Sequence, residues 1–189
     1  TLFGSDTISD VMCGNKVDIS PLSFYQVNTV QAERLYAKAL EYAAPDNTKV
    51  IVDLYCGAGT IGLSMAKTAG KIVGVEIVPQ AVENAGKNAE FNNITNAEFH
   101  CGDSGEVFAK LRSHGCDPDI IVLDPPRKGC SEETLQTVCV AQPDKIVMIS
   151  CNPSTAARDA KWLSNNGYST VKVCGFDLFP RTRHVECVV

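Results

Sequence analysis

The 189-residue sequence has no apolar run long enough to cross a membrane as a helix, which takes about 20 residues. It has no low-complexity tract, and no signal-peptide pattern opens it. These absences argue against a membrane protein and against a secreted one. With hydrophobic residues at 44% and charged residues at 21%, the chain has the composition of an ordinary globular protein. We expect a cytoplasmic protein without a membrane partner, with room for one substantial domain and a small extension.

Metal-binding and disulfide patterns are absent as well, although the chain has nine cysteines. No two of them are spaced as C-x-x-C, and they are distributed singly from Cys13 to Cys187, mostly within apolar segments. In a cytosolic protein, buried reduced thiols are the simplest interpretation of most of them. The sequence therefore predicts no metal site and no disulfide framework.

Basic residues are scarce for a protein that would bind nucleic acid, because affinity for a phosphate backbone comes largely from Lys and Arg. The formal net charge is −5. The part from Asp124 onward holds 8 basic and 7 acidic residues, whereas residues 1–123 hold 9 and 15. Alone, this chain is expected to bind nucleic acid weakly. It also has no initiator Met, and we expect it to be a piece of a longer protein.

The pattern of apolar residues predicts two parts. Residues 1–45 are predicted to form two short strands around a Gly14-Asn15 turn and a helix from about Thr29 to Ala43. Residues 46–189 alternate between strands and helices, with helices expected over Ile61–Ala69, over Pro79–Phe91 and after each of the next three strands. The strands predicted there are Lys49–Leu54, Lys71–Val78, Ala97–Cys101, Asp119–Leu123, Lys145–Ser150, Tyr168–Gly175 and His184–Val189.

This alternation is typical of an α/β domain with a mainly parallel sheet covered by helices on both faces. Such sheets bind ligands at the carboxyl ends of their strands, where the strand order reverses. The residues that follow each strand are therefore the first candidates for function.

The loop after the first strand of this domain is rich in glycine. Gly57-x-Gly59-x-x-Gly62 matches the fingerprint of dinucleotide-binding loops, in which glycines let the backbone turn tightly and approach a flat ligand. Asp53, at the end of the preceding strand, would face the pyrophosphate of a dinucleotide unfavourably. It would instead attract the cationic amino end of S-adenosylmethionine.

Two further carboxylates follow the next two strands. Glu76 can hold ribose hydroxyls, and Asp103 can accept a hydrogen bond from an adenine amino group. In this order the three loops favour an S-adenosylmethionine-dependent methyltransferase over an NAD-dependent oxidoreductase, which remains the alternative from another class. A cofactor-binding assay separates the two.

The fourth loop is Asp124-Pro125-Pro126-Arg127-Lys128-Gly129. Its two prolines fix the backbone after the strand and form a rigid lip beside the cofactor. Methyltransferases that act on exocyclic amines often have an aromatic residue after Asp-Pro-Pro, whereas this chain has Arg127, so a different target is indicated. The alternative is a turn that carries a solvated basic pair.

Cys151 and Glu186 are the candidates for covalent and acid–base chemistry. Cys151 lies after a strand and before a helix, where the helix N-terminus and Arg158 would lower the pKa of its thiol. The alternative is a core cysteine. Glu186 interrupts an apolar strand and is expected to be a base with a raised pKa in a partly dry pocket. Its alternative is an edge-strand carboxylate paired with Arg181 or Arg183.

Five segments together resemble motifs of the RNA 5-methyluridine methyltransferases, most closely the branch that acts on 23S ribosomal RNA. They are Phe24–Asn28, Asp53–Gly59, Asp124–Gly129, Ser150–Pro153 and His184–Glu186, in this order along essentially the whole chain. The resemblance implies a Rossmann-like class I S-adenosylmethionine-dependent methyltransferase fold with a seven-stranded, mainly parallel sheet. It also implies that residues 46–189 form the catalytic domain and that residues 1–45 lead into it.

The resemblance carries roles for single residues. It implies that Cys151 is the nucleophile and Glu186 the general base, and that Gln26 and Asp124 contact the target uracil. Residues expected to bind S-adenosyl-L-methionine are Gln26, Tyr55, Gly57, Gly59, Thr60, Glu76, Asp103 and Asp124. Family members usually also carry an N-terminal oligonucleotide-binding barrel, and some an iron–sulfur cluster; neither is in this sequence. RNA, most of all ribosomal RNA, is the expected partner, bound weakly by this piece alone.

The chemistry of uracil explains why these residue types are needed. Carbon 5 is a poor nucleophile until a thiolate adds to carbon 6 and converts the ring into an enolate. Three related alternatives stay open: a transfer RNA uridine, an RNA cytosine methylated at carbon 5, and a non-catalytic RNA-binding module. The intact Cys151 and Glu186 argue against the last. His184 is expected to be structural or to contact RNA.

Overall fold

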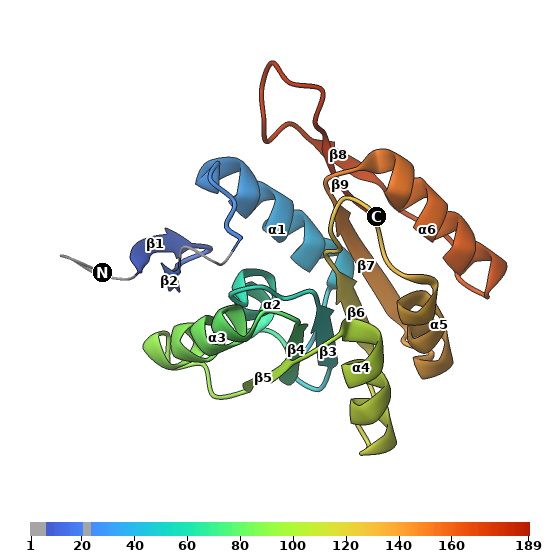
Figure 1. The fold of residues 1–189 in the computed structure, drawn as a ribbon, viewed down its shortest axis with the longest axis horizontal. Coiled ribbons are helices and arrows are strands. Elements are labelled where there is room, and N and C mark those ends of the chain that lie inside the picture. Colours follow the sequence, from blue (N-terminus) through green and yellow to red (C-terminus); the bar gives the residue numbers. More distant parts are fainter. Residues whose placement is uncertain (1–6, 21–23) are drawn as a thin grey trace.

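A computed structural model of the chain describes residues 7–20 and 24–189 (Figure 1). Near the N-terminus, β1 (Ile8–Met12) and β2 (Asn15–Ile19) form an antiparallel hairpin. Cys13 and Gly14 make its turn, with φ of 52° and 74°. Two consecutive positive φ angles are typical of two-residue hairpin turns. The predicted Gly14-Asn15 turn is therefore wrong by one residue, because Asn15 already pairs with Met12.

The second sheet has seven strands in the order β5-β4-β3-β6-β7-β9-β8, which confirms the predicted α/β fold. The four contacts among β3 to β7 are parallel, and β9 runs antiparallel to both β7 and β8. The strands are β3 (Val50–Leu54), β4 (Lys71–Glu76), β5 (Ala97–Cys101), β6 (Ile120–Leu123), β7 (Lys145–Ser150), β8 (Cys174–Phe176) and β9 (Glu186–Val188).

Helices cover both faces of this sheet (Figure 1). They are α1 (Thr29–Ala43), α2 (Thr60–Met65), α3 (Pro79–Phe91), α4 (Ser104–Ser113), α5 (Glu132–Ala141) and α6 (Pro153–Asn165). Successive strand residues point to opposite faces: Ile51 packs in the core with α1 and α2, whereas Val52 packs with α4, α5 and α6. None of the helices in the described ranges is long and apolar enough to span a membrane.

Several predicted elements are shorter in the structure. The predicted strand Lys71–Val78 ends at Glu76, and the predicted strand His184–Val189 is limited to Glu186–Val188. The predicted helix Ile61–Ala69 ends at Met65, where a turn follows. Of the predicted strand Tyr168–Gly175, only Cys174 and Gly175 belong to β8. The partner strand β9 has only three residues, and on the β8 side all three pair with Cys174–Phe176. Residues 168–173 therefore have no strand with which to form hydrogen bonds. Their β-branched side chains fit a strand in sequence, but Val171 is 86% exposed.

The strand order reverses at the centre of the sheet. From β3 the chain moves outward to β4 and β5, then returns to the other side of β3 with β6 and β7. The loops after β3 and β6 therefore begin side by side, and the backbone N–H of Asp124 donates to the carbonyl oxygen of Leu54 (3.3 Å). Such a switch point is where open α/β sheets bind their ligands.

Candidate active site

The glycine loop after β3 faces open space. Tyr55, Gly57 and Gly59 have φ of 70°, 54° and 83°, so the backbone turns sharply into α2. A Cβ atom added at Gly57 would meet nothing within 4 Å. Glu76, at the end of β4, accepts hydrogen bonds from the backbone N–H groups of Gly57 (3.1 Å) and Val78 (2.9 Å). The loop and the Glu76 carboxylate thus frame one side of an open site.

Asp53 lies beneath this loop with no accessible surface. One carboxylate oxygen accepts a hydrogen bond from the backbone N–H of Gly62 (2.9 Å), and the other has no partner among the described residues. Burial raises the pKa of Asp53 to about 7, although the Gly62 bond opposes the shift. The amide oxygen of Gln26, which is 6% exposed, is also buried without a partner. Buried acceptors without a donor are costly, so both fit a ligand that brings cationic N–H donors.

Tyr55 and Thr60 occupy the same loop and the helix start that follows it. The hydroxyl of Tyr55 lies 3.3 Å from that of Thr134, and burial raises the pKa of Tyr55 to about 12. Thr60 is the first residue of α2, and its side chain is close enough to Tyr36 of α1 to oppose the rise that burial causes in the pKa of that hydroxyl. Both side chains therefore border the glycine loop while also linking it to neighbouring helices.

Asp103 follows β5 and forms the N-cap of α4. Its side chain accepts hydrogen bonds from the backbone N–H groups of Gly105 (2.9 Å) and Glu106 (3.3 Å) through one oxygen. The residue is exposed at the same edge of the sheet as the glycine loop. The other carboxylate oxygen of Asp103 does not take part in these capping bonds and can accept a hydrogen bond from a ligand.

Cys151 and Glu186 meet where β7 and β9 part. The register of these strands pairs Ser150 with Cys187. Cys151, which follows β7, is therefore a neighbour of Glu186, the first residue of β9. Glu186 is 3% exposed, and burial raises the pKa of its carboxyl while Arg127 acts in the opposite sense. Among the described residues, neither Arg181 nor Arg183 forms an ion pair with it. Glu186 therefore has the raised pKa expected of a buried base.

The thiol of Cys151 has a raised pKa, not the lowered one predicted from sequence. Partial burial is the main cause, and the carboxyl groups of Glu186 and Asp124 add to it. The predicted effect of Arg158 is wrong because that guanidinium is bound elsewhere. It lies 2.6 Å from a carboxylate oxygen of the buried Asp159 and donates to the carbonyl oxygen of Cys130 (3.2 Å).

Asp124 completes an acidic group on this side of the site. Burial raises its pKa well above the usual value, and the nearby carboxyl groups of Asp53 and Glu186 add to the shift. Three carboxyl groups and a thiol therefore converge at the carboxyl ends of β3, β6 and β7. Such a concentration of groups with raised pKa values is typical of functional sites.

Arg127 is the residue whose place sequence reasoning missed. Its charge is close enough to Cys151 and Glu186 to oppose the rise in the pKa of both groups. Arg127 is exposed and lies in a turn, as the solvated alternative predicts, but its charge also acts on both of these groups. The signal in the sequence was its position in the loop after β6, because β6 and β7 are parallel neighbours and their following loops lie at the same edge of the sheet.

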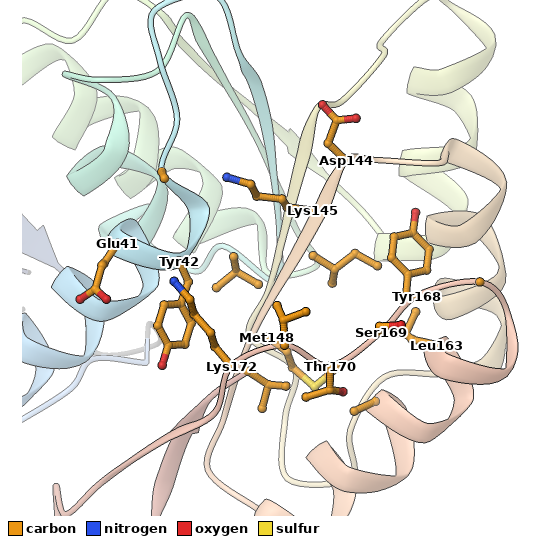
Figure 2. Close-up of a pocket in the computed structure, with 17 residues that line it drawn as sticks. Glu41, Tyr42, Asp144, Lys145, Met148, Leu163, Tyr168, Ser169, Thr170 and Lys172 are labelled. Atoms are coloured by element: carbon orange, nitrogen blue, oxygen red, sulfur yellow. The ribbon is translucent and has the colours of Figure 1, made fainter.

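A pocket of about 560 Å³ lies away from this group (Figure 2). It opens beside the first residues of β7, between the end of α1 and residues 167–172. Lys172 lies over the ring of Tyr42, 5.2 Å from its centroid, at the mouth of the pocket (Figure 2). Cys151 follows the opposite end of β7, so the predicted site residues do not line this pocket.

Comparison with known proteins identifies the family. A family model described as tRNA (uracil-5-)-methyltransferase matches residues 16–189. RNA methyltransferases named as uncharacterized, from Oceanobacillus iheyensis and Bacillus cereus, are 48% identical over 187 residues and 50% identical over 188. These matches cover 99% and 100% of this chain but 41% of each relative. The chain thus spans about two-fifths of the length of these curated relatives.

Comparison with solved structures indicates the same family. A tRNA (uracil-54, C5)-methyltransferase from Pyrococcus abyssi, in complex with S-adenosyl-L-homocysteine, matches with a TM-score of 0.84 and 34% identity. The match covers 98% of this chain and 44% of that one. A putative S-adenosylmethionine-dependent methyltransferase from Streptococcus mutans, 12% identical with a TM-score of 0.69 over 98% of this chain and 55% of that one, shares the fold. The chain has the class I methyltransferase fold and belongs to the RNA uracil-C5 methyltransferase family.

Proposed function

We propose that the protein methylates carbon 5 of a uridine in RNA, with S-adenosylmethionine as methyl donor and Cys151 as nucleophile. The observation that carries the proposal is the convergence of Cys151, Glu186 and Asp124 beside the open glycine loop. A thiol, a buried carboxyl base and a second, half-buried carboxyl group are the set that this reaction needs.

The cofactor would lie against the glycine loop. When bound there, S-adenosylmethionine supplies an electrophilic methyl group. Asp53 and Gln26 carry the unpaired buried oxygens that can accept hydrogen bonds from its cationic amino end. Glu76 is placed for ribose hydroxyls and Asp103 for the adenine amino group, while the bare backbone at Gly57 leaves room for the ligand. A negatively charged pyrophosphate has no comparable cation here, which disfavours the NAD alternative.

The first step is addition of the Cys151 thiolate to carbon 6 of the uracil. A carbon–sulfur bond forms, and the electron pair of the carbon 5–carbon 6 double bond passes into an enolate ending on oxygen 4. Carbon 5 thereby becomes nucleophilic enough to accept a methyl group. Asp124 and Gln26 recognise the polar edge of the ring, and the base must leave its stack to reach them.

The second step returns the enzyme to its starting state. Glu186 removes the proton from the methylated carbon 5, the ring double bond re-forms, and the carbon–sulfur bond breaks to release the Cys151 thiolate. Its raised pKa makes Glu186 a stronger base than an ordinary carboxylate. The proton moves to Glu186, and the methyl group that replaces it on carbon 5 would leave its donor as S-adenosyl-L-homocysteine, so atoms and charge balance over the cycle.

Large-subunit ribosomal RNA is the substrate class that the sequence motifs favour, and transfer RNA is the class named for the Pyrococcus abyssi enzyme. The length of the curated relatives supports a further segment that supplies most of the RNA affinity. The net charge of −5 agrees with this division of labour.

The test uses the full-length protein with S-adenosylmethionine and, in separate reactions, 23S ribosomal RNA and transfer RNA that lack 5-methyluridine. After digestion to nucleosides, mass spectrometry should find new 5-methyluridine in the ribosomal reaction. New 5-methyluridine only in the transfer RNA reaction would correct the substrate class. New 5-methylcytidine, or no methylated nucleoside from either RNA, would contradict the proposed reaction.

A further inference from the structure

The backbone of Arg127 is anchored to the helix start that follows Cys151. The side chains of Asn152 and Thr155 donate hydrogen bonds to its carbonyl oxygen, at 3.1 Å and 3.3 Å. Asn152 is also the N-cap of α6, where its other amide atom accepts from the backbone N–H of Ser154 (3.1 Å). The loop after β6 therefore keeps a constant position relative to the cysteine.

The guanidinium of Arg127 rests on the ring of His184. Its Nη2 atom lies 3.3 Å from Nδ1 and 3.4 Å from Nε2 of the imidazole. An atom in the ring plane at equal distance from both nitrogens would collide with the carbon between them, so the guanidinium lies over the ring face. The rings of Phe179 and His184 also meet edge to face, with centroids 6.4 Å apart and planes at 84°. A planar guanidinium suits such stacking, and an ammonium does not.

The groups around the Cys151 thiol otherwise oppose its ionisation. Glu186 from β9 and Asp124 from the loop after β6 both raise its pKa, and the thiol of Cys187 lies close enough to interact with it. Arg127, whose carbonyl oxygen is bound by the side chain of Asn152 next to Cys151, is the cation that acts in the opposite sense. Without that cation, a thiolate at this position would face only like charge and partial burial.

We propose that Arg127 and His184 are positioning residues, in which the His184 ring holds the Arg127 guanidinium against the Cys151 sulfur so that the thiolate forms. Arg127 acts on the sulfur directly, whereas His184 acts only through Arg127. This inference rests on the proposed role of Cys151 as nucleophile, but it concerns a property of the thiol that exists without RNA or cofactor.

The test measures the ionisation of Cys151 by the rate of its alkylation with iodoacetamide across a pH series, in the full-length protein. Residues 146–158 form a tryptic peptide with Cys151 as its only cysteine, so mass spectrometry isolates this thiol from the other eight. The alkylation rate follows the thiolate fraction. In Arg127→Ala the apparent pKa of Cys151 should rise by about one unit, which slows alkylation about tenfold at neutral pH.

Lys128→Ala is the matched control, because it removes an equally exposed positive charge from the next position of the same loop. It should leave the apparent pKa of Cys151 within about 0.2 units of the parent value, as expected of a screened charge without contact. Arg127→Lys keeps the charge but loses the flat stacking surface, and should recover part of the loss. Equal shifts in Arg127→Ala and Lys128→Ala would overturn the proposal.

His184→Ala separates positioning from a merely structural role. It should raise the apparent pKa of Cys151 in the parent background and have no further effect in the Arg127→Ala background, because the two residues act in series. Additive shifts in the double variant would overturn the assignment of His184. If these shifts appear but no 5-methyluridine forms from any RNA, the proposed function fails while the positioning pair stands.

Discussion

At the scale of single residues, the site is a set of acids kept close together in a partly dry environment. Glu186 was predicted from sequence as a base with a raised pKa, because a lone carboxylate in an apolar strand stands out. The unpaired oxygens of Asp53 and Gln26 could not be predicted in this way. Whether a buried atom finds a partner depends on the packing of distant segments, which a single sequence does not show.

Asp53 should reduce the stability of the cofactor-free protein at neutral pH and above. Its pKa of about 7 in the folded state exceeds the unfolded value of about 3.9, so the unfolded state binds fewer protons between these values. Stability therefore falls as pH rises through this window. Asp53→Asn keeps an acceptor for the Gly62 N–H and removes the charge. We expect the free energy of unfolding of Asp53→Asn to exceed that of the parent by about 1–2 kcal/mol at about pH 8, and this difference should shrink toward about pH 4.

The measurement is urea unfolding of both proteins over that pH range, with binding of S-adenosyl-L-homocysteine measured alongside. The variant should bind it more weakly. Asp119→Asn is the control of opposite sign, because Lys49 and the Val50 N–H hold the pKa of Asp119 below its usual value. Asp119→Asn should be less stable than the parent at neutral pH and as stable as the parent in acid. A variant of Asp53 less stable than the parent at about pH 8 would contradict this account of the buried carboxyl.

Glu186→Gln should separate the two halves of the reaction. The amide cannot take the carbon 5 proton, so the enzyme should add to RNA and then stall as a covalent adduct at Cys151. Gel analysis under denaturing conditions should show a protein–RNA band that needs S-adenosylmethionine. Cys151→Ala should show neither this band nor turnover. Parental turnover by Glu186→Gln would exclude Glu186 as the base.

At the scale of elements, glycine serves two different purposes around the β3 loop. Gly57 has a φ of 54° and empty space where a Cβ atom would lie, whereas a Cβ atom at Gly74 of β4 would collide with the Phe99 ring and lie 2.8 Å from the sulfur of Cys56. One glycine therefore leaves room for a ligand, and the other leaves room for the core.

The two alanine variants should behave differently. Gly57→Ala should lose about 1 kcal/mol of stability from the left-handed backbone and bind S-adenosyl-L-homocysteine about tenfold or more weakly. Gly74→Ala should lose about 1–3 kcal/mol from overpacking. Its binding should be near parental while it stays folded. Calorimetry and thermal unfolding on the same samples decide this, and parental binding by Gly57→Ala would contradict the placement of the cofactor.

Most elements followed from local pattern, and two of the exceptions depend on contacts between distant segments. The helix Thr29–Ala43 and the strand Lys145–Ser150 were predicted with their observed bounds, because cap residues and apolar periodicity mark them in sequence. The predicted strand Tyr168–Gly175 is wrong over residues 168–173 because a strand needs a partner, and on its β8 side β9 pairs only with Cys174–Phe176. The role of Arg127 was missed for a similar reason: its stack with His184 joins residues 57 positions apart.

At the scale of the whole molecule, the negative net charge of this chain predicts that it binds the cofactor well but RNA weakly. With a net charge of −5, this chain alone should bind a 23S ribosomal RNA fragment at least about tenfold more weakly than the full-length protein. Its affinity for S-adenosyl-L-homocysteine should match that of the full-length protein within about twofold, because all the residues proposed to contact the cofactor lie within the chain. Filter binding over a salt series measures the RNA affinities, and calorimetry measures the affinities for S-adenosyl-L-homocysteine. Equal RNA affinities of this chain and the full-length protein would contradict this prediction.

The central claim is a covalent bond between Cys151 and carbon 6 of a uracil. The most direct test is the intact mass of the full-length protein after incubation with S-adenosylmethionine and RNA that contains 5-fluorouridine, whose fluorine blocks the final proton removal by Glu186. We predict an adduct that carries one methyl group and maps, after nuclease and trypsin digestion, to Cys151 in residues 146–158. An adduct on another cysteine, or no adduct where ordinary RNA is methylated, would contradict the account.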